Sequence, residues 1–136
     1  MEQKARIVSC IEYYSFLKNI PANKVFLSFQ QASILEIILE SNQSFPEMDT
    51  AFYAGMIDGI IAMERDADED DFTHYKERTA LVCDVVAMLE KKHGFTSPEA
   101  CAYYYKSNIA ALVSEDNTGF YQKTPAEIYN LIESES

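Results

Sequence analysis

The chain has 136 residues, 48% of them hydrophobic, with only four glycines and four prolines. This is enough for one domain with its own core, and the composition favours long helices over a turn-rich β fold. The net charge of −11 opposes binding to nucleic-acid phosphates or anionic lipid, and no apolar run approaches the ~18 residues of a membrane span. We therefore expect a soluble, cytoplasmic protein with no direct nucleic-acid or membrane partner, whose partner is a more basic protein.

The first predicted element is an amphipathic helix. Ile7, Ile11, Tyr14 and Leu17 recur at the spacing that places them on one helix face. An equivalent helix is predicted later in the chain. Its apolar face is formed by Leu81, Val85, Met88 and Leu89.

The two predicted helices belong to segments that align with each other. Residues 19–45 match residues 94–120 without a gap, so that, for example, Ile34 meets Ile109 and Phe45 meets Phe120. Because the apolar pattern agrees through successive elements, we predict two diverged copies of one multi-helix unit. The expected fold is a single all-α domain over residues 1–136, a compact helical bundle. Repeat one spans about residues 3–62, an acidic linker residues 63–73, and repeat two about residues 74–134.

Several helix boundaries are also predicted. Gly94 is typical of a helix end, and Ser97 followed by Pro98 is typical of a helix start. Residues 124–127 (Thr-Pro-Ala-Glu) have the spacing of a capping box before a last helix. Residues 44–47 (Ser-Phe-Pro-Glu) have the same spacing in the first copy and predict its fourth helix.

The acidic segment between the copies raises the question of calcium binding. Asp66, Asp68, Asp70 and Glu77 occupy positions one, three, five and twelve of an EF-hand loop. Position six, where the loop turns sharply and glycine is usual, is Asp71. A solvated linker between folded units is the alternative, with Asp70 or Asp71 capping the next helix. We favour the linker and keep the calcium loop as the second interpretation.

No catalytic motif is evident in the sequence. The two histidines, His74 and His93, lie in no metal-binding or nucleophile signature, although folding could still bring a cysteine to a histidine. Cys10, Cys83 and Cys101 form no CxxC pair and are predicted to be reduced core thiols. We therefore expect a non-enzymatic protein without a cofactor, and the sequence leaves its oligomeric state open.

Three consecutive tyrosines lie in one predicted helix. Tyr103, Tyr104 and Tyr105 cannot all face one neighbouring element. The alignment of the copies predicts that Tyr104 points inward and that Tyr103 and Tyr105 point outward. Exposed tyrosines can anchor protein interfaces, so Tyr103 and Tyr105 are candidate partner-binding residues. Ordinary amphipathic surface is the alternative.

The first 60 or so residues carry a family resemblance. Residues 10–14 read Cys-Ile-Glu-Tyr-Tyr, and Lys24, Val25 and Phe29 follow in the second predicted helix. These residues resemble the pattern of the short bacterial helical proteins known as domain of unknown function 3791. The resemblance implies a small non-enzymatic protein encoded beside an ADP-ribosyltransferase-like toxin, and hence an antitoxin-like or regulatory role.

Together these features predict a protein-binding helical module. An acidic surface would raise the rate of encounter with a basic partner, and apolar side chains would hold the complex. The predicted electrostatic contacts are acidic residues of the linker: Asp66, Asp68, Glu69, Asp70 and Asp71. The alternatives are a calcium-responsive module and an acidic mimic of nucleic acid.

Overall fold

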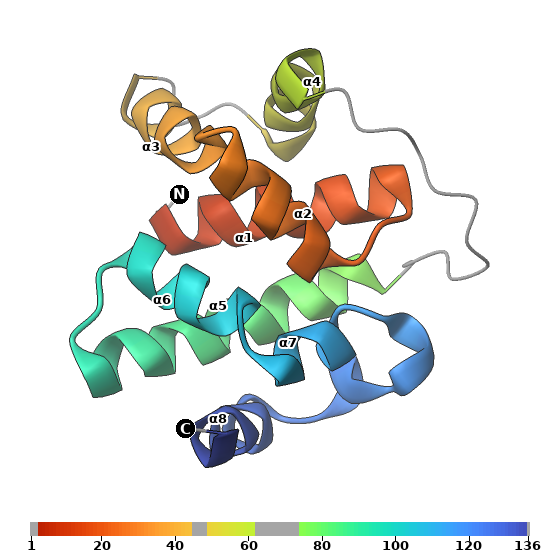
Figure 1. Cartoon of the computed structure of the whole chain (residues 1–136), viewed down its shortest axis with the longest axis vertical. Helices are drawn as coiled ribbons and strands as arrows, with labels where there is room; N and C mark the ends of the chain where they lie inside the picture. The colour runs from red at the N-terminus through yellow and green to blue at the C-terminus, as the bar shows by residue number, and fades with distance from the viewer. Residues whose placement is uncertain (1–2, 45–48, 62–73, 136) are drawn as a thin grey trace.

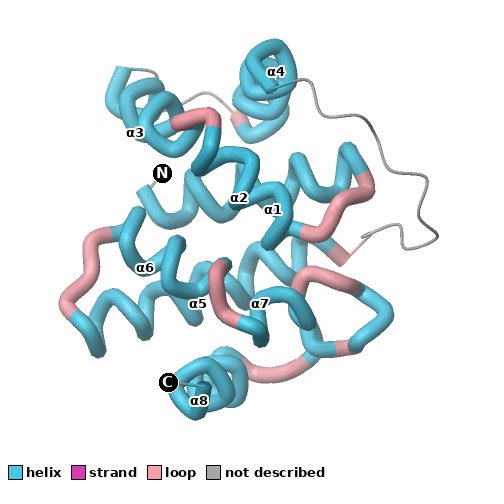
Figure 2. The backbone as a smooth tube through the Cα atoms, in the orientation of Figure 1, coloured by secondary structure: helices cyan, strands magenta, loops and turns pink. Residues whose placement is uncertain are grey.

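The computed structural model describes residues 3–44, 49–61 and 74–135, and all secondary structure in these ranges is helical (Figures 1 and 2). The elements are α1 (Gln3–Lys18), α2 (Ala22–Gln31), α3 (Ile34–Ser44), α4 (Thr50–Ile61), α5 (Tyr75–His93), α6 (Ser97–Tyr105), α7 (Asn108–Val113), the 3₁₀ turns η1 (Asp116–Thr118) and η2 (Phe120–Gln122), and α8 (Pro125–Glu135). This confirms the all-α bundle. Within the described ranges, no helix is long and apolar enough to span a bilayer.

Helices α1 and α5 form the centre of the bundle, and they share the most extensive contact between any two elements (Figure 1). Helices α2, α3 and α4 pack around α1, and α8 packs against α5. The predicted inward faces are confirmed for Ile7 and Ile11 in α1 and for Val85 in α5, all of which are completely buried. Leu17 is an exception, because its side chain is 39% exposed at the end of α1.

Capping groups fix three of the helix boundaries. Gly94 ends α5 in the left-handed conformation (φ 70°), as predicted. Helix α6 starts one residue earlier than expected, because Thr96 rather than Ser97 is the cap and forms a capping box with Glu99. The predicted box at the start of α8 is confirmed, since the backbone N–H of Glu127 donates to Thr124 Oγ1 over 3.2 Å and the Thr124 N–H donates back to the Glu127 carboxylate.

Most of the predicted capping box at residues 44–47 lies outside the described residues. Ser44 is the last residue of α3, and α4 begins at Thr50. The capping group is Asp49, whose Oδ1 accepts a 2.8 Å hydrogen bond from the backbone N–H of Phe52. An aspartate carboxylate caps a helix start as well as a serine hydroxyl does. The sequence was therefore compatible with a cap at Asp49 as well as with the predicted box at Ser44.

Candidate functional site

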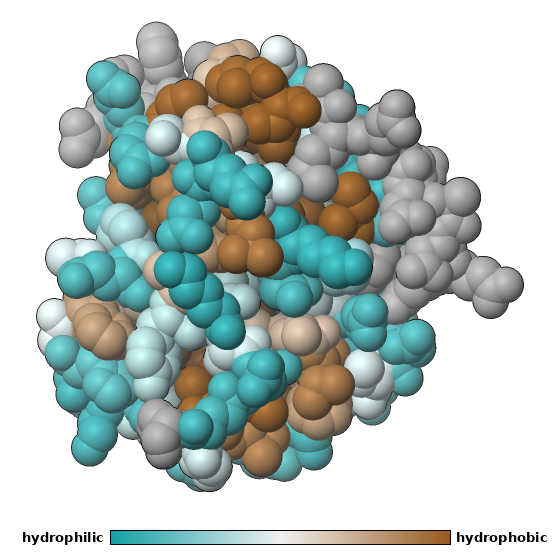
Figure 3. All heavy atoms as spheres, viewed as in Figure 1, coloured by the Kyte–Doolittle hydropathy of each residue, from teal (hydrophilic) through white to brown (hydrophobic). Residues whose placement is uncertain are grey.

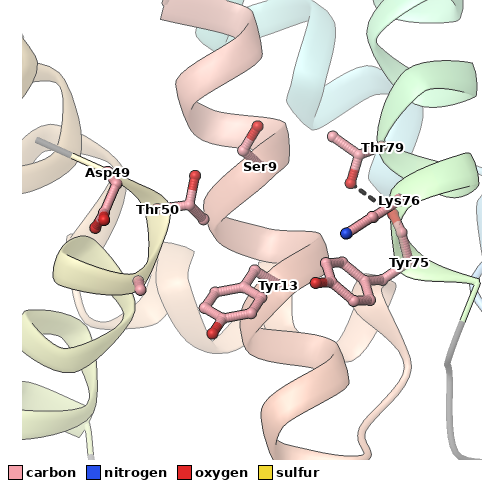
Figure 4. A pocket seen from close by; sticks show the side chains of 8 residues that line it. Ser9, Tyr13, Asp49, Thr50, Tyr75, Lys76 and Thr79 are labelled. Atoms are coloured by element: carbon pink, nitrogen blue, oxygen red, sulfur yellow. Dashed lines mark hydrogen bonds between the residues drawn. The ribbon is translucent and has the colours of Figure 1, made fainter. Parts of the chain in front are cut away.

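The described residues leave one face of α1 open beside α4 and the start of α5, and we call this surface the α1 groove. It consists of two adjoining hollows, with cavity volumes of about 470 Å³ and 330 Å³, that share Tyr13 and Ala51. The larger hollow is lined by Ser9, Tyr13, Asp49, Thr50, Ala51, Tyr75, Lys76 and Thr79 (Figure 4). The smaller is lined by Tyr13, Tyr14, Leu17, Lys18, Ala51, Ala54, Gly55 and Asp58.

The α4 wall of the groove is held on α1 by a buried cation–π contact. Arg6 is 1% exposed, and its guanidinium carbon lies 4.3 Å from the centroid of the Tyr53 ring. Ala54 and Ile57, on the same side of α4, are also buried. The wall is therefore a preformed part of the fold.

Hydrogen bonds join α1 to α4 at the far end of the groove. The hydroxyl of Tyr14 donates to Asp58 Oδ1 over 2.8 Å, and Lys18 Nζ lies 3.1 Å from the same oxygen. The hydrogen bonds from Tyr14 and Lys18 lower the pKa of the Asp58 carboxyl below its ordinary value. The smaller hollow thus ends at a locally balanced ion pair.

Aromatic rings form the floor of the groove on the α5 side. The Tyr75 ring stacks on Phe16 with centroids 4.5 Å apart, and the Tyr13 and Tyr75 centroids are separated by 5.6 Å. Lys76 extends its amino group toward the interior of the larger hollow (Figure 4). The Thr79 hydroxyl donates to the Tyr75 carbonyl over 2.6 Å, so this polar group is already satisfied. The floor accordingly offers mainly ring faces and aliphatic carbon.

Beneath the groove, a buried ionic network joins α1, α5, α6 and η1. The carboxylate of Glu12 accepts hydrogen bonds from Arg78 Nε (2.9 Å) and from the Tyr105 hydroxyl (2.8 Å). Arg78 Nη1 also donates to Asp116, and both the backbone N–H (2.9 Å) and ring Nδ1 (3.0 Å) of His74 lie against the other Asp116 oxygen. Asp116 therefore caps α5 from a distant part of the sequence.

Burial governs the acidity of this network. Glu12 and Arg78 are 1% and 0% exposed. Desolvation raises the pKa of the Glu12 carboxyl above its ordinary value, and the charge and hydrogen bond of Arg78 oppose that rise. The network holds the start of α5, and with it Tyr75 and Lys76, in a fixed position beside α1.

The predicted acidic contacts and most of the predicted calcium loop lie outside the described residues. These are Asp66, Asp68, Glu69, Asp70 and Asp71. Glu77 belongs to the first turn of α5. Among the residues that the structure describes, no group of three or more histidine, cysteine, aspartate or glutamate side chains could hold a metal ion.

The tyrosine predictions have mixed outcomes. Tyr104 is 1% exposed and faces inward, as predicted. The outward orientation predicted for Tyr105 is wrong: its side chain is 2% exposed, stacks on Phe26 with centroids 5.3 Å apart, and donates its hydroxyl to Glu12. Tyr105 therefore cannot contact a partner in the folded chain. Tyr103 is half-buried and lies 5.2 Å from the His93 ring.

Sequence reasoning missed the buried charges Arg6, Glu12 and Arg78. A signal existed, because Arg78 precedes Leu81 by three residues and so shares its inward helix face. Each histidine also contacts a carboxylate, His74 that of Asp116 and His93 that of Glu133 at 2.7 Å.

Comparisons with known proteins give no match among protein-family models, curated proteins or solved structures.

Proposed function

We propose that this chain is a protein-binding helical module, and that the α1 groove receives an amphipathic, cationic segment of another protein. The observation that carries the proposal is the groove itself: two adjoining hollows follow one face of α1, the larger lined by residues of α1, α4 and α5 and the smaller by residues of α1 and α4. A helix or extended segment with a line of apolar side chains fits such a track.

In this proposal, apolar contacts in the groove supply most of the binding affinity. Tyr13, Leu17 and Ala51 lie along the floor and α4 wall of the groove, and Leu17 is 39% exposed. Covering aromatic and aliphatic surface of this kind is the main source of affinity in protein interfaces. Because α4 is anchored through Tyr53 and α5 through Arg78, the walls need little rearrangement on binding, and this reduces the entropic cost of association.

The negative net charge of the chain favours encounter with a cationic partner. The chain carries 22 acidic and 11 basic residues, so its field attracts cations from a distance. Within the groove itself, Lys18 and Asp58 already pair with each other, and Asp49 and Lys76 add one charge of each sign. A cationic partner therefore gains mainly in its rate of encounter, which falls as ionic strength rises.

The family resemblance in the first 60 or so residues supports a neutralising or regulatory role toward an ADP-ribosyltransferase-like toxin. In that role, occupation of the groove by a segment of the toxin would occlude a part of the toxin that its activity requires. Whether the gene lies beside such a toxin gene can be read directly from the genome. If the neighbouring toxin failed to bind the purified chain, the antitoxin role would be excluded, although groove binding to another protein would not.

We also propose that the bundle arose by duplication of a four-helix unit. The proposal is supported by matching boundaries, since α2 begins at Ala22 and α6 at Ser97, and α4 begins at Thr50 and α8 at Pro125. Asn19 and Gly94, at aligned positions after the first helix of each unit, both have positive φ, 57° and 70°. A superposition of the helices of residues 3–61 on those of residues 75–135 tests this origin.

The binding proposal is tested by a pair of charge-matched variants. Ser9→Arg inserts a long cationic side chain at the α1 groove, whereas Gln30→Arg adds the same charge at an exposed position on α2. Proteins captured from the native cells by the wild-type chain would be identified, and their affinities measured by titration calorimetry. We expect Ser9→Arg to weaken binding at least about tenfold, and Gln30→Arg to change it little. Equal effects of the two variants would remove the groove as the binding site.

A further inference from the structure

The larger hollow of the α1 groove carries opposite charges on its two sides. Asp49 lies just before α4 on one side, and Lys76 lies in the first turn of α5 on the other (Figure 4). Both residues are exposed, and the Lys76 amino group extends toward the interior of the hollow. Glu77, the next residue of α5, does not line the hollow. The hollow therefore presents a cation at its α5 side and an anion at its α4 side.

Few other charges lie along this part of the groove. Apolar side chains gather over α4 in the space-filling view (Figure 3), and the single charged residue of that helix, Asp58, is paired with Lys18. Asp49 Oδ1 accepts the Phe52 N–H that it caps. Within the described ranges, neither Asp49 nor Lys76 forms an ion pair. No described side chain therefore neutralises either charge of the larger hollow.

The centre of the larger hollow suits an aromatic side chain. The Tyr13 and Tyr75 rings are tilted by 44° with centroids 5.6 Å apart, so they offer both a face and an edge to a third ring. Ser9 and Thr50 place hydroxyl groups at the same hollow, where they can bond the polar tip of a tyrosine. The cavity volume of about 470 Å³ leaves room for one such side chain.

From these features we propose that the segment bound in the α1 groove places an aromatic side chain in the larger hollow, with an acidic side chain toward Lys76 and a basic one toward Asp49. The inference rests on the proposed function, since it names the chemistry of the segment that the groove receives. Each charged pair lies at the rim of the interface, where it adds modestly to affinity but discriminates between partners. A segment that is cationic overall can still contain the one acid that Lys76 selects.

Blocked tripeptides test this chemistry without a captured partner. Acetyl-Glu-Tyr-Lys-amide and acetyl-Gln-Tyr-Gln-amide both have zero net charge, so the −11 of the chain favours neither. Each is titrated into isotope-labelled protein, and the amide NMR signals of Tyr13, Tyr75 and Lys76 report binding. We expect the Glu-Tyr-Lys peptide to bind about fivefold more tightly than the Gln-Tyr-Gln peptide. Acetyl-Glu-Ala-Lys-amide, without the ring, should bind at least about tenfold more weakly than the Glu-Tyr-Lys peptide.

Neutral variants of the protein assign each charged pair. Lys76→Gln should remove the advantage of the peptide glutamate, measured as Glu-Tyr-Gln against Gln-Tyr-Gln, and keep that of the peptide lysine. Asp49→Asn should do the reverse, and asparagine also caps helices, so α4 should stay folded. Circular dichroism verifies the folding of both variants. As controls for location, Ser9→Arg should weaken binding of the Glu-Tyr-Lys peptide at least about tenfold, and Gln30→Arg should change it little.

Equal affinities for the Glu-Tyr-Lys and Gln-Tyr-Gln peptides would overturn the inference and leave the groove as a segment-binding site. Advantages of the charged peptides that survive both Lys76→Gln and Asp49→Asn would do the same. Unchanged signals of Tyr13, Tyr75 and Lys76 at millimolar concentrations of every peptide would also overturn it. The proposed function is decided separately, by the effects of Ser9→Arg and Gln30→Arg on captured proteins.

Discussion

The Nε atom of Arg78 donates a 2.9 Å hydrogen bond to the carboxylate of Glu12, and both side chains are almost completely buried. The two residues lie at the interface of the central helices α1 and α5, far apart in the sequence. Tyr105 and Asp116 satisfy further atoms of the pair. An ion pair removed from water is stable only when its remaining polar atoms also have partners, and this requirement ties α6 and η1 to the central helices.

Loss of Arg78 should be strongly destabilising. Arg78→Met leaves the Glu12 carboxylate buried without its counter-charge, which typically costs ~3–5 kcal/mol of the free energy of unfolding. Urea unfolding monitored by circular dichroism would measure this cost. Adding Glu12→Leu to the same variant should restore much of the stability, because a buried ion pair replaced by apolar groups is often neutral. If the double variant were no more stable than Arg78→Met, the unpaired carboxylate would not be the cause of the loss.

Removal of one oxygen from Tyr105 should affect stability and not partner binding. Tyr105→Phe keeps the ring stacked on Phe26 but takes away the hydrogen bond to Glu12, at an expected cost of ~1–3 kcal/mol because the acceptor is charged. Thermal unfolding gives the change in stability, and affinity for a captured partner gives the second readout. Tyr103→Ser is the comparison, since Tyr103 is only half-buried. Weaker binding by a fully folded Tyr105→Phe variant would contradict the buried role.

The helical architecture was predictable because it follows from local periodicity. Ile7, Ile11 and Val85 repeat at helical spacing, and burial of one face is enough to place them in the core. Gly94 was predictable as a helix end for a similar reason, since the left-handed conformation favours glycine. Such features depend on neighbours within one or two helical turns.

The contacts between helices were not predictable in the same way. Glu12 finds Arg78 and Tyr105 only after α1, α5 and α6 have packed together. Tyr105 was assigned to the surface because its aligned counterpart, Gln30, is polar, and Gln30 is indeed exposed. Tyr105 is buried instead, because its hydroxyl donates a hydrogen bond to the buried carboxylate of Glu12. The α1 groove has no sequence signature either, because it depends on how the described residues of α4 and α5 pack beside α1.

Glu12 should give the protein an unusual dependence of stability on pH. Burial raises the pKa of this carboxyl above its ordinary 4.5, so in the pH range between 4.5 and the raised pKa the folded chain retains a proton that the unfolded chain has released. The contribution of Glu12 is therefore fully present below pH 4.5 and is lost as pH rises through the folded pKa. The Glu12→Gln variant has no titrating carboxyl at this position, so it lacks this pH-dependent contribution to stability. The stability of the wild type relative to Glu12→Gln should fall as pH rises through this window.

Comparison of these two proteins removes the contributions of other acids. Hydrogen bonds from Thr96 and Thr124 lower the pKa values of Glu99 and Glu127, so those groups add stability above their unfolded pKa and lose it as pH falls. Both proteins contain them, and they cancel in the difference. Urea unfolding at a series of pH values gives that difference directly. A difference that rose with pH would show that Arg78 outweighs burial at Glu12.

The three thiols should differ sharply in reactivity. Cys10 and Cys101 are completely buried, and desolvation raises the pKa of Cys10 to about 12 and that of Cys101 further still. Cys83 is half-buried. Because alkylation requires an accessible thiolate, iodoacetamide at neutral pH should modify Cys83 first and reach Cys10 and Cys101 only through unfolding. Mass spectrometry of a labelling time course, with and without urea, measures each site. Rapid labelling of Cys10 in the native protein would mean that α1 opens easily, which is incompatible with a rigid floor for the α1 groove.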